Sequence, residues 1–348
     1  MKRSIKYIKG FDSLRALSIT LVLITHLGLS DHVSDTPFVM DRLWFMISGD
    51  TGVQIFFTLS GFLITLILLT EKKDSGTIKL SRFYLKRFLR LLPPLLILYP
   101  LVFISMLNGW IVDSYTGLWY SIFYIYNFIP NDEYTSELIH TWSLAVEEQF
   151  YFVWPFVLFF LKKERIIQAI TMLVILTSGI LLFLIPGFEM AIHFRMERWF
   201  LPAVAPIMIG SLAAALYFSD ENRLEKKIKS NGLVLVLCIV LFISPLFLPQ
   251  SILMISPIIQ AFGIGLLLLW IASNQNSRFV NLLDNRPMNY LGKISYGLYV
   301  YQGFFLGTGP GGNIDVQSYP LNIILVFAVA ILSYELIEKP VLGLKSKI

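Results

Sequence analysis

Two ionisable side chains in the first apolar segment of this sequence are spaced to share one face of a helix. Arg15 and His26 are eleven residues apart, which in an α-helix is three turns plus roughly 20°, or about 16 Å along the axis. Ionisable groups at bilayer depth are costly, so they usually pair or line a functional cavity. Neutral imidazole is the usual acceptor of a hydroxyl proton near pH 7, so His26 is either a general base or a polar contact between helices.

Two adjacent carboxylates, Glu147 and Glu148, lie at a depth in another apolar segment similar to that of His26. A carboxylate at this level could orient the imidazole and stabilise its charged form. Neighbouring side chains on a helix point about 100° apart, so at most one of the two can face His26 directly. The alternative is a buried pairing with a cationic group, namely His140, Arg195 or Arg198.

Arg87 and Arg90 belong to a basic segment that leads into a further apolar stretch. Because they are three residues apart, they are neighbours on one helix face, and planar guanidinium groups match phosphate oxygens. Basic segments beside a membrane also fix topology and touch anionic lipid, and charge alone favours that simpler interpretation.

Small residues and cysteine give weaker signals. Ser60 and Gly61 interrupt an apolar segment, and the default explanation of such a pair is close approach of helix backbones. The single cysteine, Cys238, lies within an apolar run, so neither a disulfide framework nor a thiolate metal site can form. No metal is expected.

The elements that must position these groups are membrane-spanning helices. Of the 348 residues, 56% are apolar and 15% charged, and the mean hydropathy is +0.69, which a soluble fold could not accommodate. Apolar segments of the length that a bilayer requires follow one another. The ten predicted spans are 13–29, 51–70, 91–107, 143–161, 166–185, 199–218, 232–248, 251–272, 290–307 and 320–339.

We therefore expect an all-α polytopic membrane protein of about ten transmembrane helices. The single membrane domain is predicted to cover residues 1–348, with no separate soluble domain. The aromatic segment 116–129 is too short to cross comfortably, so we assign it to the interface or to a re-entrant loop packed on protein.

The distribution of lysine and arginine predicts the orientation of these spans. If both termini are cytoplasmic, the inner segments hold 23 of the 28 basic residues and the outer segments only Arg42, Arg195 and Arg198. Such a bias is typical of the positive-inside rule. The net charge of +5 is thus a topology signal rather than a footprint of nucleic acid.

Taken together, these motifs resemble the acyltransferase 3 family of bacterial membrane proteins. The resemblance covers essentially the whole chain and includes Arg15 with His26 after ten intervening residues. The other matching stretches are Gly52 to Ile64 around Ser60-Gly61, Arg87-Phe-Leu-Arg90, Trp142 to Tyr151 with Glu147 and Glu148, Ile294-Ser-Tyr296-Gly-Leu-Tyr299, and Ser333 to Pro340. One such motif is weak evidence, but six in order are strong.

The resemblance implies an O-acyltransferase of the bacterial inner membrane that moves an acyl group, expected to be acetyl, from cytoplasmic acyl-CoA to a sugar hydroxyl of an extracytoplasmic glycan. His26 would be the catalytic base, and Glu147 or Glu148 would support the reaction centre. Arg15, Ser60 and the pair Arg87 and Arg90 would belong to the donor side. Membrane lipids and a glycan or glycolipid are the implied partners, nucleic acid is not, and a homo-oligomer stays open.

One departure from the family pattern concerns a second histidine. Many members place one soon after the Ser-Tyr motif, where this chain has Tyr301-Gln302-Gly303. The departure puts in doubt any mechanism that needs two histidines, but not the role of His26. The alternative function is a transporter or flippase for lipid-linked glycans, which would also carry a few intramembrane charges.

Overall fold

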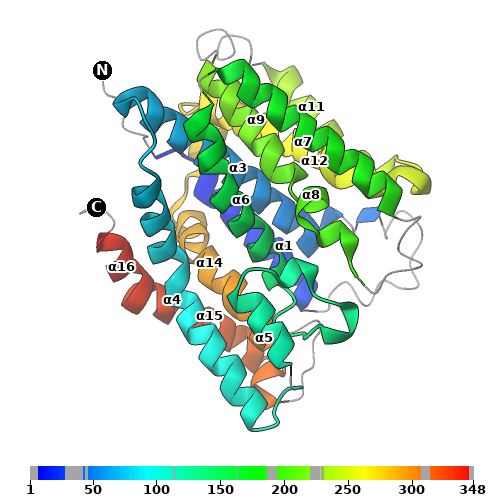
Figure 1. Ribbon diagram of the computed structural model, residues 1–348, viewed down its shortest axis with the longest axis vertical. Coiled ribbons are helices and arrows are strands. Elements are labelled where there is room, and N and C mark those ends of the chain that lie inside the picture. Colours follow the sequence, from blue (N-terminus) through cyan, green and yellow to red (C-terminus); the bar gives the residue numbers. More distant parts are fainter. Residues whose placement is uncertain are drawn as a thin grey trace.

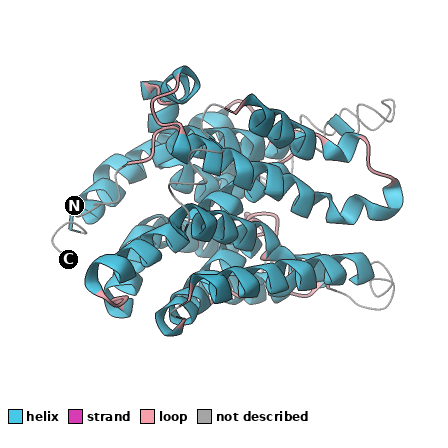
Figure 2. Ribbon diagram, turned by 90° about the horizontal axis from the view of Figure 1, so that it is seen from above, coloured by secondary structure: helices cyan, strands magenta, loops and turns pink. Residues whose placement is uncertain are grey.

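The computed structural model describes residues 7–27, 42–43, 46–112, 114–161, 163–185, 194–219, 228, 231–306 and 314–344. Within these ranges the chain consists of helices and connecting loops and forms no β-strand (Figure 2). One isolated bridge joins Pro130 to Phe194. The predicted all-α class is therefore confirmed for the part of the chain that the structure describes.

Three helices form the centre of the molecule: α1 (Phe11–His26), α3 (Gly49–Ser75) and α14 (Arg286–Leu306). Glycines allow their backbones to touch. A Cβ on Gly52 would lie 2.6 Å from the Ser18 carbonyl oxygen, and one on Gly292 would lie 2.0 Å from the Asp12 carbonyl oxygen. Because only a residue without a side chain fits at such an approach, α1 is held tightly between α3 and α14.

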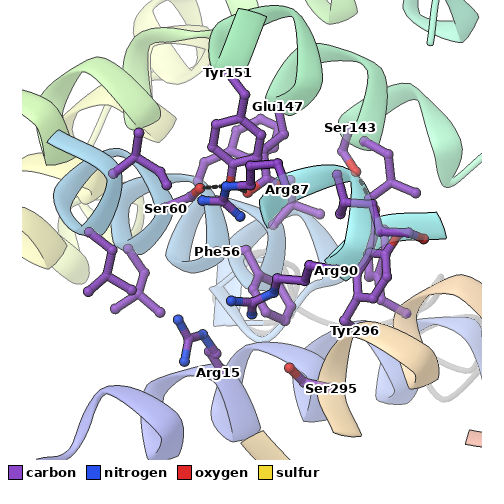
Figure 3. A pocket seen from close by; sticks show the side chains of 18 of the residues that line it. Arg15, Phe56, Ser60, Arg87, Arg90, Ser143, Glu147, Tyr151, Ser295 and Tyr296 are labelled. Carbon is purple, nitrogen blue, oxygen red and sulfur yellow. Dashed lines mark hydrogen bonds between the residues drawn. The ribbon is translucent and has the colours of Figure 1, made fainter. Parts of the chain in front are cut away.

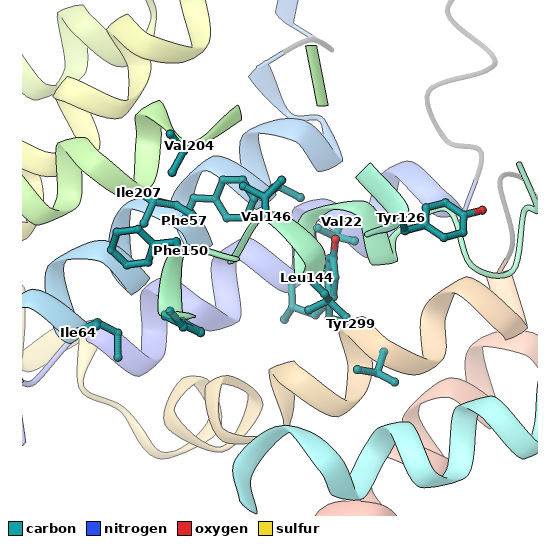
Figure 4. Close-up of a cluster of buried hydrophobic side chains, with 14 of the residues drawn as sticks. Val22, Phe57, Ile64, Tyr126, Leu144, Val146, Phe150, Val204, Ile207 and Tyr299 are labelled. Atoms are coloured by element: carbon teal, nitrogen blue, oxygen red, sulfur yellow. The ribbon is translucent and has the colours of Figure 1, made fainter. Parts of the chain in front are cut away.

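The helices α3 and α9 (Ala205–Ser219) cross at a second pair of glycines. A Cβ on Gly61 would meet the Ile207 carbonyl oxygen at 1.8 Å, and one on Gly210 would meet the Thr58 carbonyl oxygen at 1.9 Å. The close-approach explanation of the small pair in this segment is thus confirmed for Gly61. Around the crossing, apolar side chains of α1, α3, α6, α9 and α14 form one buried cluster (Figure 4).

The helix α6 (Thr141–Phe160) lies between α3 and α4 (Leu80–Leu107). Tyr84 of α4 donates a hydrogen bond to the Phe152 carbonyl oxygen. At the end of α3, Lys72 Nζ donates to the carbonyl oxygens of Leu158, Phe159 and Leu161 at 2.6–3.0 Å. A cation at the last carbonyls of a helix satisfies acceptors that have no partner within the helix, so the end of α6 is fixed beside the end of α3.

Further helices cover the centre on two sides (Figure 1). One group consists of α7 (Glu164–Leu184), α9, α11 (Gly232–Phe242) and α12 (Ser256–Ser273). The other group contains α4, α5 (Tyr115–Ile122), α15 (Leu321–Ser333), the π-helical turn Tyr334–Glu338 and α16 (Lys339–Leu344). The short helices α8 (Phe200–Ala203) and α13 (Arg278–Leu283) and several 3-10 turns connect the longer helices.

Of the three central helices, α1 and α14 run in the same direction and α3 runs in the opposite one. Gly49 N, at the start of α3, donates to Thr25 Oγ1 near the end of α1 at 2.6 Å, so the two helices are antiparallel. Tyr7, ahead of α1, bonds to Asp284, ahead of α14. We call the side at which α1, α4 and α14 begin and α3 and α6 end the basic side, because most basic residues flank it.

Five helices among the described residues are long and apolar enough to cross a membrane: Gly49–Ser75, Leu80–Leu107, Glu164–Leu184, Ile252–Ser273 and Leu321–Gly343. Every predicted span overlaps helical structure. Neither α6 nor α14, which contribute polar side chains to the cavities described below, is among the five. A membrane protein is supported, and the count of ten spans stays a prediction. The segment predicted to be interfacial forms the short helix α5 and a 3-10 turn, Tyr126–Phe128.

Candidate active site

Three arginines from two helices line one cavity, which we call the cationic cavity (Figure 3). Arg15 comes from α1, and Arg87 and Arg90 from α4; the cavity volume is about 260 Å³. Asp12 forms an ion pair with Arg15, with 2.5 Å between Nη1 and Oδ1. Among the other lining residues are the polar side chains Ser60, Ser143, Glu147, Tyr151, Ser295, Tyr296 and Tyr299. The structure thus brings together all of the side chains that the sequence predicted for the donor side.

A chain of polar contacts crosses the cationic cavity from α3 to α6. Ser60 Oγ pairs with Tyr151 Oη, and Tyr151 Oη donates to Glu147 Oε1. The guanidinium of Arg87 stacks over the Tyr151 ring, with 3.9 Å from Cζ to the ring centroid. A cation over an aromatic face is attracted by the ring quadrupole, so Glu147 and Ser60 fix the ring on which Arg87 rests.

The two adjacent glutamates face different spaces. Glu148 lines an apolar groove of about 790 Å³ between α4, α5 and α6, whereas Glu147 lines the cationic cavity. The groove meets the cationic cavity at Arg87, Leu91 and Tyr151, which line both. Neighbouring side chains on a helix point about 100° apart, so α6 directs Glu147 into the cationic cavity and Glu148 into the apolar groove.

A second cavity, which we call the histidine cavity, lies at the end of the central helices opposite the basic side. It has a volume of about 260 Å³, and its polar lining comes from Thr25, His26, Ser48, Asp50, His140, Trp142, Arg198 and Tyr299. Neither Glu147 nor Glu148 lines it. The carboxylate that shares this cavity with His26 is Asp50, at the exposed start of α3.

Two residues, Val53 and Tyr299, line both the cationic and the histidine cavity. The Tyr299 hydroxyl donates to the His140 carbonyl oxygen at 3.1 Å and lies 2.5 Å from Ser143 Oγ. Its ring packs edge-on against Phe56 and against the His140 imidazole, with centroids 6.1 and 5.6 Å apart. Tyr299 is therefore a firmly held part of the wall between the two cavities.

His140 supplies a second imidazole beside His26, from the loop ahead of α6 rather than from α14. The side chain is only 3% exposed, and a Cβ on Gly303 of α14 would come within 2.1 Å of His140 Nδ1. Burial, and to a smaller extent the charge of His26, lowers the pKa of the His140 imidazole to about 3. The imidazole is thus neutral at physiological pH.

Arg195 and Arg198, which the sequence suggested as partners for Glu147 or Glu148, lie instead beside Glu197. Arg195 Nη1 and Arg198 Nε lie 3.8 and 4.0 Å from Glu197 Oε1. The Arg198 guanidinium also stacks over Trp142 and Tyr134, at 5.2 and 5.7 Å from their ring centroids.

Nothing in the sequence pointed to Asp50 as a residue of this site, and Arg198 stood out only as a possible partner of the glutamates. Asp50 reaches the histidine cavity because α3 is antiparallel to α1, and Arg198 reaches it from a segment that follows α7. Tyr299 belonged to a motif shared with the family, but the sequence did not place it between two cavities. Helical spacing relates residues of one helix only, and these contacts lie between elements that are distant in the sequence.

Comparison with known proteins gives one family match. Residues 8–334 match the family model described as an acyltransferase domain. The peptidoglycan O-acetyltransferase OatA of Listeria monocytogenes is 27% identical over 97% of this chain and 56% of its own length. The putative peptidoglycan O-acetyltransferase YrhL of Bacillus subtilis is 28% identical over 97% of this chain and 55% of its own length. The O-acetyltransferase OatA of Staphylococcus aureus is 28% identical over 97% of this chain and 57% of its own length.

The chain therefore spans about half the length of the curated relatives that it matches. No solved structure matches it.

Proposed function

Because the chain belongs to the acyltransferase domain family, we propose that it is a membrane O-acyltransferase that moves an acyl group, expected to be acetyl, from acyl-CoA to a sugar hydroxyl of a glycan. Relatives named as peptidoglycan O-acetyltransferases support a cell-wall or surface glycan as the acceptor. One observation carries the proposal: a cavity with three arginines and a cavity with two histidines share the wall residues Val53 and Tyr299.

The cationic cavity suits the donor. Coenzyme A carries several phosphate groups, and arginine forks bind phosphate oxygens with paired, charge-assisted hydrogen bonds. Arg15, Arg87 and Arg90 line the cavity together, and Arg87 is held on the Tyr151 ring by the contact described above. In this proposal Glu147 serves the donor side, because it positions Tyr151, while Ser60 supports the same ring from α3.

The histidine cavity suits the acceptor. His26 accepts the proton of the sugar hydroxyl, whose oxygen attacks the thioester carbonyl carbon. A C–O bond forms, the C–S bond breaks, and the thiolate leaves on the donor side and takes up a proton. Asp50 lines the same cavity and stabilises the imidazolium that forms, a role for a carboxylate that the sequence had offered to Glu147 or Glu148.

The layout supports delivery across the membrane. We propose that the basic side is cytoplasmic, as the distribution of basic residues predicts, so that acyl-CoA enters from the cytoplasm and the glycan from outside. In bacteria this places a multi-pass protein in the inner membrane. The apolar groove that contains Glu148 is lined in part by Phe88, Leu96 and Phe152. These side chains are exposed and are suited to contact with lipid.

The first test is replacement of the proposed base. In purified protein supplied with radiolabelled acetyl-CoA and an N-acetylglucosamine oligosaccharide, His26→Ala is expected to lower acetyl transfer by about 10²–10⁴-fold, the usual effect of losing a general base. Leu17→Ala is the control, because Leu17 is 44% exposed on α1 and lines neither cavity. Near wild-type turnover in a folded His26→Ala protein would refute the assignment. A wild-type protein that releases no CoA would favour the transporter.

The second test separates donor binding from topology. The double variant Arg87→Ala/Arg90→Ala is expected to raise the KM for acetyl-CoA at least about tenfold, because lost charge-assisted hydrogen bonds are worth roughly 1.5–3 kcal/mol each. The double variant Arg82→Ala/Lys86→Ala removes the same charge from the same helix at positions that do not line the cavity. Equal effects of the two double variants would return Arg87 and Arg90 to a topological role.

A further inference from the structure

Two side chains that line the histidine cavity have buried polar atoms without a hydrogen-bond partner. Among the described residues, neither ring nitrogen of His140 has a partner at hydrogen-bond distance and angle, and the same holds for Arg198 Nη1; all three atoms are buried. The Val300 backbone lies beside the His140 ring and is the backbone group that interacts with it. Buried polar groups in native proteins are normally hydrogen-bonded, so each such group needs an explanation. Both residues line the histidine cavity, which makes a ligand there the most direct explanation.

Both side chains are also held in place. The His140 ring lies against Gly303 on one side and against the edge of Tyr299 on another, 5.6 Å between ring centroids. The Arg198 guanidinium is stacked on Trp142 and Tyr134 and has Glu197 beside its Nε atom. Groups that are positioned before a ligand arrives bind it at a lower entropic cost.

Their chemistry specifies complementary partners. A neutral imidazole can accept a hydrogen bond from a hydroxyl group on one nitrogen and donate on the other, whereas arginine only donates. Arginine therefore needs an oxygen that is a strong acceptor, such as the carbonyl oxygen of an amide substituent. Trp142 adds an aromatic surface to the same cavity, against which the apolar C–H groups of a sugar ring can pack.

We propose that the histidine cavity is the acceptor subsite, in which His140 hydrogen-bonds to a hydroxyl and Arg198 to an amide carbonyl oxygen of the same N-acylated sugar ring. This inference rests on the proposed function and adds two binding residues to it. The histidine cavity has a volume of about 260 Å³, which is smaller than the roughly 300–1,000 Å³ of pockets that bind drug-sized ligands. The subsite therefore accommodates one sugar ring, and the remainder of the glycan lies outside.

The test measures the KM for each substrate separately, with acetyl-CoA as donor and an N-acetylglucosamine oligosaccharide as the acceptor probe. Loss of one hydrogen bond to a charged or buried partner corresponds to about a tenfold or greater change in binding. His140→Ala and Arg198→Ala are each expected to raise the KM for the acceptor by about this factor, with the KM for acetyl-CoA changed less than about twofold. His140→Asn, which keeps a donor and an acceptor, is expected to recover part of the loss.

A second probe checks the role of Arg198 without depending on the folding of a variant. The N-deacetylated oligosaccharide lacks the amide carbonyl and carries ammonium groups that a guanidinium repels. The wild-type protein is expected to prefer the N-acetylated probe at least about tenfold, and Arg198→Ala to lose that preference. Unchanged preference, or an equal rise in both KM values, would overturn the inference, because a purely structural role would affect donor and acceptor alike.

The outcome is distinguishable from failure of the proposed function. If wild-type protein transfers acetyl and His26→Ala does not, but both His140→Ala and Arg198→Ala keep a normal KM for the acceptor, only the acceptor subsite is wrong. If wild-type protein does not cleave acetyl-CoA at all, the acyltransferase proposal itself fails.

Discussion

At the scale of single residues, the structure divides the polar groups of the candidate site between two cavities. Arg15, Arg87 and Glu147 line the first, and His26 and Asp50 line the second. Tyr299 contributes to both linings, and its hydroxyl is anchored on the opposite helix through Ser143 and the His140 carbonyl. A thioester carbonyl that is to meet a hydroxyl from the other cavity must do so beside this ring.

The Tyr299 ring is therefore predicted to keep bulk water from the thioester. Tyr299→Ala would join the two cavities, and the ratio of acetyl-CoA hydrolysis to acetyl transfer is expected to rise several-fold, because excluding water suppresses hydrolysis as a side reaction. The ratio is measured by assaying CoA release with and without an oligosaccharide acceptor.

Tyr299→Phe provides the matched comparison. It keeps the ring but removes the hydroxyl that bonds to the His140 carbonyl and Ser143. The ratio is expected to rise much less than in Tyr299→Ala, while stability decreases by about 0.5–1.5 kcal/mol for the lost hydrogen bond. If Ala and Phe raised hydrolysis equally, the hydroxyl rather than the ring would be responsible.

At the scale of helices, glycine contacts decide how closely the elements approach and hence where the cavities lie. The glycines Gly52, Gly61, Gly210 and Gly292 each face the backbone of a neighbouring helix. Ser60, next to Gly61, points into the cationic cavity. One side of α3 is thus used for packing against α9 and the adjacent side for chemistry.

Gly61→Ala is predicted to destabilise the crossing of α3 and α9. The new Cβ would lie 1.8 Å from the Ile207 carbonyl oxygen, so the backbones must separate; inserting a methyl group into a packed contact costs about 1–3 kcal/mol. We expect a lower melting temperature in detergent together with reduced transfer, because Ser60 moves with α3.

Gly232→Ala is the matched control for this substitution. Gly232 is the first residue of the apolar helix α11, and a Cβ there meets nothing within 4 Å. Its melting temperature is expected to equal or exceed that of the wild type, since alanine favours helix more than glycine. A Gly61→Ala protein as stable as Gly232→Ala would contradict the close packing of α3 on α9.

At the scale of the whole molecule, the chain surrounds three central helices with two groups of outer helices (Figure 1). The antiparallel pairing of α1 and α3 places Arg15 toward the basic side and His26 at the other end. The cationic cavity and the histidine cavity therefore lie toward opposite ends of the same bundle, which is the arrangement that the proposed transfer across a membrane needs.

This arrangement predicts that the basic side is cytoplasmic, because 23 basic residues flank it and three flank the other. A fluorescent reporter that matures only in the cytoplasm is expected to be active when fused after Ile348. Alkaline phosphatase, which is active only outside, is expected to be active when inserted in the exposed turn Asn131–Glu133. The reverse pattern in the two fusions would overturn the orientation and the assignment of the two cavities.

The sequence by itself determined the features that depend on local spacing and composition. Apolar runs predicted the helices, and the interval between Arg15 and His26 placed both on one helix long enough to connect two cavities. The three-residue spacing of Arg87 and Arg90 was enough to predict that they lie on one helix face and line one cavity. The motifs identified the acyltransferase family. Backbone hydrogen bonding makes helices regular, so positions within one helix follow from counting residues.

Only the tertiary structure decided which helix faces meet. It placed Glu147 in the cationic cavity and Glu148 in the apolar groove. It also placed Asp50 in the same cavity as His26 and packed His140 against Gly303. The physical reason is that the rotation of each helix is set by side-chain packing with its neighbours, through contacts such as Gly61 on α9, and this packing depends on residues far apart in the chain. Helical periodicity contains no information about that rotation.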